Sequence, residues 1–227
     1  EIGLATDEPG ARLRIDDGTP TGKLIDPEVE VKLYTSIEHG ALTSVASIVL
    51  HRTDSSSATG TLSAYEGGKT TGAHFLIDKL GKIYQTARVD QVCWHVGILV
   101  ARCQAESNCD PQELKTITAL LHEKGLSFST RAKNLSRHEV AKTYPQRYPA
   151  NSDSLGIEVV GKYVAADKAF ELPTPEQLKS VKYLVDILVA QFKLNLLSDV
   201  YAHGAIARKE VSEGAQLLQS LLTGAKP

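Results

Sequence analysis

The sequence predicts an α/β domain in which a central mixed β-sheet is flanked by helices. Two short segments, "SVASIVLHRT" (44–53) and "SLGIEVVG" (154–161), are apolar and rich in β-branched residues, as buried strands are. The segment 174–194 repeats apolar residues at helical spacing and is the clearest helix of the chain. Strands mixed with helices that cover one or both faces of a sheet define this fold class.

Composition excludes two classes of partner. The 227 residues are 42% hydrophobic, which suffices for one well-buried domain with an added subdomain. A net charge of −2 gives no basic surface for nucleic acid or for anionic lipid. Apolar runs stay far below the roughly 20 residues that cross a bilayer. We therefore expect no nucleic-acid partner and no transmembrane segment.

The N-terminal part is expected to be irregular. Residues 1–40 are rich in Gly, Pro, Asp and Thr and predict an extended arm, with one short strand in "EVEVKLY" (29–35), ahead of a domain at 41–227. The segment 57–68 predicts a loop with a helical turn. "AHFLIDKLGKIYQTA" (73–87) predicts two strands joined by a tight turn, in which Gly81 supplies the turn geometry.

Residues 101–150 are more polar and predict a helical insertion. Two helices are expected, at about 111–124 and 130–142, and they should pack as a lobe at the groove of the domain. Apolar residues at helical spacing support this prediction: Leu114, Ile117, Leu120 and Leu121. Cys103 and Cys109 could close a small loop in an oxidising compartment, and free thiols are an equal alternative.

The last third of the chain predicts two helices. Thr174 and Gln177 form a capping box at the start of the first, and Pro175 occupies its first position. A short helix is expected at 213–222.

Two polar residues in the predicted strands are candidates for chemistry. His51 ends the first strand, where α/β folds commonly place their sites, although a lone histidine is more often structural. Glu158 lies inside an apolar strand between Ile157 and Val159, and burying an unpaired carboxylate is costly. Such a carboxylate is either paired or used for acid/base work. Gly156, on the same strand face, is expected to leave open space beside it.

A third candidate region is the loop "VYAHGAIARKEVSEG" (200–214). It carries His203, Lys209 and Glu213 within a short stretch. Catalytic zinc usually takes three protein ligands of histidine and carboxylate type, which His51, His203 and one carboxylate would supply. The alternative is a polar surface loop in which Glu213 merely starts a helix.

Five segments, in this order, resemble the zinc-dependent N-acetylmuramoyl-L-alanine amidases: "LHRT", "GAHFLIDKLGKIYQ", "CWHVG", "NSDSLGIEVVG" and "YAHGAIARK". This type-2 amidase family includes phage lysins and is related to the peptidoglycan recognition proteins. The resemblance covers roughly residues 45–223 apart from 101–150. It implies that zinc-activated water cleaves the amide bond between N-acetylmuramic acid and L-alanine.

The resemblance also implies a role for individual residues. It matches His51 and His203 to zinc ligands, Glu158 to the catalytic acid/base and Lys209 to the lysine that stabilises the oxyanion. It matches the substrate-binding positions to His95 and Trp94 of "CWHVG", and to His74, whose role is structural or substrate-orienting.

Two departures from the family pattern affect these roles. The third zinc ligand is usually Asp or Cys two residues after the lysine, and here that position is Val211, which has no donor atom. We therefore expect Glu213 to be the third ligand and Glu210, which adjoins Lys209, to point away. Some members have tyrosine where this chain has Ala73, which places more of the chemistry on Glu158.

The alternatives differ in activity and in substrate. Loss of the usual third ligand would suit a non-catalytic muropeptide-binding module of the same fold. A zinc hydrolase acting on an unrelated amide or ester would keep the metal and change the substrate. The amidase prediction implies peptidoglycan or muropeptide as substrate and a periplasmic or secreted location. A secreted toxin would also have an immunity or inhibitor protein as partner.

Overall fold

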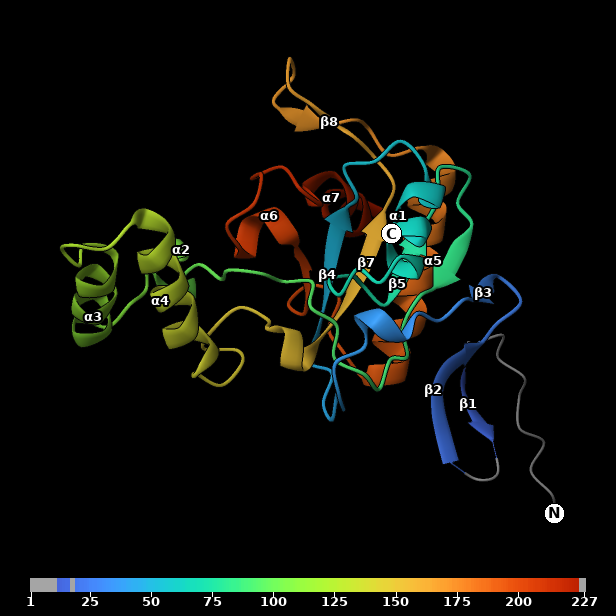
Figure 1. Ribbon diagram of the computed structural model, residues 1–227, viewed down its shortest axis with the longest axis horizontal. Helices are drawn as coiled ribbons and strands as arrows, with labels where there is room; N and C mark the ends of the chain where they lie inside the picture. The colour runs from blue at the N-terminus through green and yellow to red at the C-terminus, as the bar shows by residue number, and fades with distance from the viewer. Residues whose placement is uncertain (1–11, 17–18, 225–227) are drawn as a thin grey trace.

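A six-stranded mixed sheet forms the centre of the computed structural model, which describes residues 12–16 and 19–224 (Figure 1). Four neighbouring strands run parallel, β6 is antiparallel to β5, and β3 is parallel to β6. The mixed sheet confirms the predicted fold class. In spatial order the strands are β10 (Val200–Ala202), β4 (Ser47–Arg52), β7 (Ser154–Val159), β5 (Phe75–Ile77), β6 (Ile83–Gln85) and β3 (Val29–Val31).

One face of the sheet is covered by α5 (Pro175–Phe192) and α7 (Ala215–Gly224). The predicted capping box of α5 is confirmed, since the side chains of Thr174 and Gln177 each accept from the other's backbone N–H. The core beneath these helices includes Ile48, Leu50, Ile157, Leu184 and Leu217. Within the described part of the chain, no helix has both the length and the apolar character needed to cross a membrane.

The opposite face carries α1 (Ala58–Glu66), α6 (His203–Ile206) and the segment 96–100. Side chains alternate along β4, so Ile48 and Leu50 point to the α5 side while Val49 packs against Val96 on the other. The prediction of a mere helical turn at 57–68 was wrong. The helix α1 is nine residues long, because burial of Ala58 and Tyr65 outweighs a weak local pattern.

The described part of residues 1–40 contains three strands rather than one. β1 (Arg12–Asp16) and β2 (Thr19–Ile25) pair as an antiparallel hairpin, and β3 joins the edge of the central sheet. The strand predicted within 29–35 is thus confirmed. A short 3₁₀-helix, η1 (Thr35–Ile37), follows. Residues 1–11 and 17–18 of the predicted arm lie outside the described residues.

The insertion forms a helical lobe beside the sheet (Figure 1). It contains α2 (Arg102–Ala105), α3 (Pro111–Leu121) and α4 (Phe128–Val140). Its small core is built from Ala101, Ile117 and Leu135, and a disulfide joins Cys103 to Cys109. Leu114, expected on the apolar face of α3, is 45% exposed, because this core is too small to cover it.

Three short elements complete the fold. The 3₁₀-helix η2 (Asn151–Asp153) leads into β7. Beyond β7, the strands β8 (Tyr163–Val164) and β9 (Ala169–Phe170) pair as a two-stranded ribbon. Arg52, the last residue of β4, holds this region to the sheet by donating to the carbonyl oxygens of Val160 and Glu171 at 3.2 and 2.9 Å.

Gly214 is expected to be indispensable for this packing. Its φ is +83°, and a Cβ atom there would lie 2.3 Å from the Leu50 carbonyl oxygen. Gly214→Ala should lower the free energy of unfolding by about 2 kcal/mol or more, measured by urea denaturation, because it adds left-handed strain to a backbone clash. Gly60→Ala, in α1, is the control: its nearest neighbour would be 3.9 Å away, so stability should hold or rise slightly. Equal stability of the two variants would contradict this account.

Candidate active site

The candidate site lies where three neighbouring parallel strands end. His51 is the second-last residue of β4, and Glu158 is its register partner in β7. His203 follows β10 directly and opens α6. Glu213 comes from the loop before α7, which returns the chain to the same edge. Residues more than 150 positions apart in sequence are thereby brought together.

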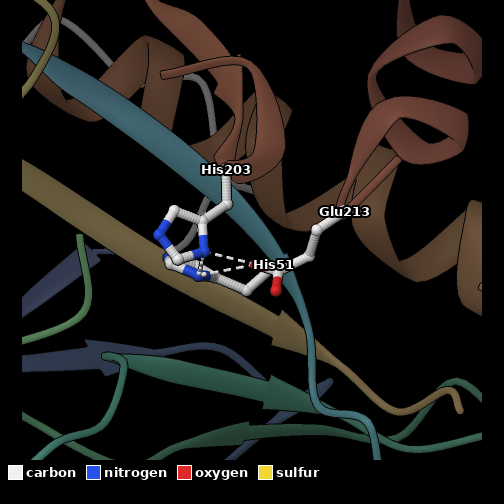
Figure 2. A group of neighbouring side chains, drawn as sticks. All are labelled: His51, His203 and Glu213. Atoms are coloured by element: carbon white, nitrogen blue, oxygen red, sulfur yellow. Dashed lines mark hydrogen bonds and ion pairs between the residues drawn. The ribbon is translucent and has the colours of Figure 1, made fainter. Parts of the chain in front are cut away.

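Three of these side chains converge on one point (Figure 2). The Nδ1 atoms of His51 and His203 are 2.9 Å apart. The Oε2 atom of Glu213 lies within hydrogen-bonding distance of His203 Nδ1 and 3.4 Å from His51 Nδ1. The three side chains are buried, and their donor atoms all lie within 4.8 Å of one another. Two imidazoles and a carboxylate in this arrangement could hold a metal ion.

The Nε2 atoms of His51 and His203, which point away from the cluster, also have hydrogen-bond partners. His203 Nε2 lies 2.7 Å from the carbonyl oxygen of Val96, which can only accept, so this nitrogen carries the proton. A neutral His203 therefore presents a lone pair on Nδ1 to the cluster. His51 Nε2 lies 2.9 Å from His95 Nδ1. The Nδ1 atoms of His51 and His203 lie close together and both face the Glu213 carboxylate, so a proton or a cation is required between them.

Burial and charge set the ionisation of the cluster. Burial, with the neighbouring His203, lowers the pKa of His51 to about 4 against the opposing effect of Glu213. Burial by itself would raise the pKa of Glu213, but the two histidines that face its carboxylate, His203 and His51, outweigh burial and hold this pKa at about 2. At neutral pH the cluster thus contains a neutral His51 and an ionised Glu213, the forms that bind metal ions.

Glu158 is in a different electrostatic environment. Its Oε2 atom is buried and has no hydrogen-bond partner among the described residues. Burial raises the pKa of Glu158 to about 8, and the charge of Glu213 adds to the effect, while Lys69, Lys209 and Arg52 oppose it. A carboxyl group with a pKa near neutrality can both accept and release a proton at physiological pH.

These residues line a cleft of about 420 Å³. Its wall also contains Lys209, His95 and Trp94, which the sequence had suggested. Trp94 is 47% exposed, and its ring stacks on that of His39 with centroids 3.5 Å apart. The cleft therefore combines a metal-type cluster, an unpartnered carboxyl group, a cation and an aromatic surface.

Some residues singled out from the sequence lie elsewhere. His74 is fully buried and does not line the cleft. Its Nδ1 accepts from the Gly156 N–H at 3.0 Å and its Nε2 donates to the Gln91 carbonyl at 2.8 Å, so its position supports a structural role and not substrate contact. Val211, at the usual ligand position, is 81% exposed. Glu210 lines the cleft, contrary to expectation, but stays outside the donor cluster.

Other cleft residues were not predicted. Arg52, Tyr65 and Lys69 line it, and no pattern in the sequence links Tyr65 or Lys69 to a strand end. The helical lobe contributes no lining residue, contrary to the expectation that it lies at the groove. It meets the site loop where the guanidinium of Arg208 lies over the Phe128 ring, 4.7 Å from its centroid. The lobe therefore stands beside the site loop and not in the wall of the cleft.

Comparisons with known proteins bear on the family and on the fold. The Amidase_2 family, described as N-acetylmuramoyl-L-alanine amidase, matches residues 41–215. No curated protein matches the sequence. Among solved structures, AmpDh3 from Pseudomonas aeruginosa has a TM-score of 0.50 at 19% identity, over 79% of this chain and 59% of that one. A mutant of PlyL also has a TM-score of 0.50, at 10% identity, over 86% and 99%. At these identities the structures support the fold alone.

The raised pKa of Glu158 predicts how metal-free protein responds to pH. The folded state holds this proton up to about pH 8, whereas the unfolded chain releases it near 4.5. The folded state therefore binds more protons between these values, and the free energy of unfolding falls as pH rises through them. Glu158→Gln should reduce this fall by about 2 kcal/mol, discounted for the partial exposure of the residue.

Urea unfolding in EDTA at pH 5 and pH 8 measures the difference. The exposed Glu123 provides a matched control, since Glu123→Gln should leave the pH dependence of the wild type unchanged. If Glu158→Gln loses as much stability as the wild type between the two pH values, the carboxyl group is not the source of the effect.

Proposed function

Because this chain belongs to the N-acetylmuramoyl-L-alanine amidase family, we propose that it hydrolyses the amide bond between N-acetylmuramic acid and L-alanine in peptidoglycan. We further propose that it does so with a zinc ion held by His51, His203 and Glu213. The observation that carries the proposal is the convergence of three buried donor atoms within 4.8 Å, at the wall of a cleft that also contains Glu158 and Lys209.

The donor set fits zinc. Two neutral imidazoles and one carboxylate are the ligands of many zinc hydrolases, and with a divalent ion they leave a net charge of about +1. Zinc, when bound, supplies Lewis acidity that lowers the pKa of a water molecule toward about 7 and polarises a carbonyl group. The close approach of His51 Nδ1 and His203 Nδ1, at 2.9 Å, is also relieved when a cation replaces the proton otherwise needed there.

Glu158 is the proposed acid/base. It takes a proton from the attacking water and later delivers it to the amine nitrogen of the L-alanine leaving group. Its buried, unpartnered Oε2 is free to make that bond. Its pKa of about 8 belongs to the metal-free site, and beside a divalent cation it falls toward the range in which a carboxylate acts as a base at neutral pH.

Lys209 and Trp94 complete the proposed site. The ammonium group of Lys209, in the wall of the cleft, stabilises the oxyanion that forms on the lactyl carbonyl of muramic acid. The exposed ring of Trp94 offers a flat apolar surface, held in place by His39, against which substrate can lie. The products are the glycan and a peptide with a free L-alanine amine.

The binding-module alternative loses its main argument. It depended on Val211 at the ligand position, yet that side chain faces solvent and Glu213 lies beside both histidines. A binder also has no need of a destabilised carboxyl group such as Glu158. The position of Glu213 therefore favours hydrolysis.

We propose a periplasmic or secreted location. The Cys103–Cys109 disulfide supports it, because disulfides persist in oxidising compartments and are rare in the reducing cytosol. The substrate of the family lies in the same compartment.

Metal analysis tests the ligand assignment. Glu213→Ala should lose bound zinc and activity together after dialysis, because it removes one of three protein ligands. Glu210→Ala is the matched control, since it removes a nearby carboxylate from the same loop and should retain both. Zinc bound tightly at full occupancy in Glu213→Ala would show that another group completes the site.

Digestion of purified sacculi tests the reaction. Mass spectrometry of the fragments should find intact glycan and peptides that begin with a free L-alanine. Glu158→Gln should fold, retain zinc and lose about 10²–10⁴-fold in rate, as expected when a general acid/base is removed. Fragments bound but uncut would indicate a binding module, and cleavage of model amides or esters without release of these peptides would indicate another substrate.

A further inference from the structure

His95 connects one candidate metal ligand to the protein backbone. Its Nδ1 atom lies 2.9 Å from His51 Nε2, and its Nε2 atom lies 3.1 Å from Ser154 Oγ. The Ser154 hydroxyl is 2.7 Å from the carbonyl oxygen of Ala150. The ring of His95 thus stands in an unbroken row of hydrogen bonds that starts at a carbonyl and ends at His51.

The carbonyl fixes the direction of every bond in this row. Ala150 can only accept, so the Ser154 hydroxyl donates to it and offers a lone pair to His95. Among the described residues no carboxylate is bonded to either ring nitrogen of His95, so the neutral form of the ring is the one that fits this row. Its Nε2–H donates to Ser154, which leaves Nδ1 to accept from the Nε2–H of His51. His51 Nδ1 then offers its lone pair to the proton or cation that the cluster requires.

The segment that holds His95 also orients the second histidine. The carbonyl of Val96, the next residue, accepts from His203 Nε2 at 2.7 Å. Both residues are anchored by one side chain, since Asn151 Oδ1 accepts from the N–H groups of His95 and Val96 at 3.0 and 2.9 Å. One short segment therefore sets the ring orientation of His51 and of His203.

The sheet is shaped to admit the His95 ring. A Cβ atom on Gly156 would lie 2.7 Å from His95 Nδ1, so the space expected to be open beside this glycine is filled by that ring. A larger residue at 156 would displace the nitrogen that faces His51.

We propose that His95 is a positioning residue for the metal site, which acts by accepting the hydrogen bond of His51 and thereby directing the His51 Nδ1 lone pair into the cluster. The proposal rests on the proposed function in one respect, namely that His51 is a metal ligand. It gives His95 a role beyond lining the groove. Outer hydrogen-bond partners of ligating histidines typically contribute about 10–100-fold to metal affinity.

Substitutions at His95 separate this role from a structural one. His95→Leu removes both ring nitrogens. His95→Asn keeps an acceptor oxygen at the place of Nδ1, whereas His95→Gln places its amide where Nε2 bonds Ser154. Titration with Co²⁺, followed by its visible absorption, should give about 10–100-fold weaker binding for Leu and Gln, and binding within a few-fold of wild type for Asn.

Which of the two amide variants, His95→Asn or His95→Gln, binds Co²⁺ more tightly decides between the positioning role and a purely structural one. A residue that merely tethers its loop to Ser154 would be rescued by Gln and not by Asn, and that result would overturn the proposal. Co²⁺ binding by His95→Leu as tight as that of the wild type would also overturn it. Circular dichroism of each variant checks that the fold is retained, and if Leu fails to fold, the Asn and Gln pair still decides.

A measurement on metal-free protein keeps the proposal independent of metal binding. Imidazole ¹⁵N NMR should find the His51 proton on Nε2 in the wild type and in His95→Asn, and a mixture of tautomers in His95→Leu. A wild-type proton on Nδ1 would refute the proposed hydrogen-bond direction. If the tautomer is as expected and the wild type binds no Co²⁺, the hydrogen bond from His51 to His95 stands, and it is the proposed metal function that fails.

Discussion

The parallel pairing of β4 with β7 is the interaction on which the site depends. Its register sets His51 opposite Glu158 on one face of the sheet and Leu50 opposite Ile157 on the other. The second pair lies in the core beneath α5 and α7, so hydrophobic burial holds the register that the first pair requires. A slip by one residue would turn His51 and Glu158 into the core, where neither could be solvated.

The site side chains are arranged at some cost to stability. His51 is buried where it cannot readily be charged, and Glu158 has a buried oxygen without a partner among the described residues. Glu213 opposes only the first effect, because its charge favours protonation of His51, and it raises the pKa of Glu158. Groups held in this way are typical of sites whose chemistry needs a lone pair or a mobile proton.

The rest of the fold keeps this arrangement fixed while the insertion remains separate from it. Gly214 lets the Glu213 loop pass close to the Leu50 carbonyl, and Asn151 anchors the segment that orients both histidines. The lobe has its own small core and disulfide and adds nothing to the wall of the cleft. Changes in the lobe can therefore alter the surface beside the site loop without altering the metal-type cluster.

The sequence by itself determined the elements whose signals are local. Period-two and helical spacing located β4, β7 and α5, and the strand patterns drew attention to His51 and Glu158 because polar residues are out of place there. Only the tertiary structure decided which side chains meet. Val211 points outward and Glu213 inward, His74 is buried, and His95 joins His51 to Ser154 across 44 and 59 positions. Such contacts depend on how the chain closes on itself, and no spacing between neighbouring residues encodes that closure.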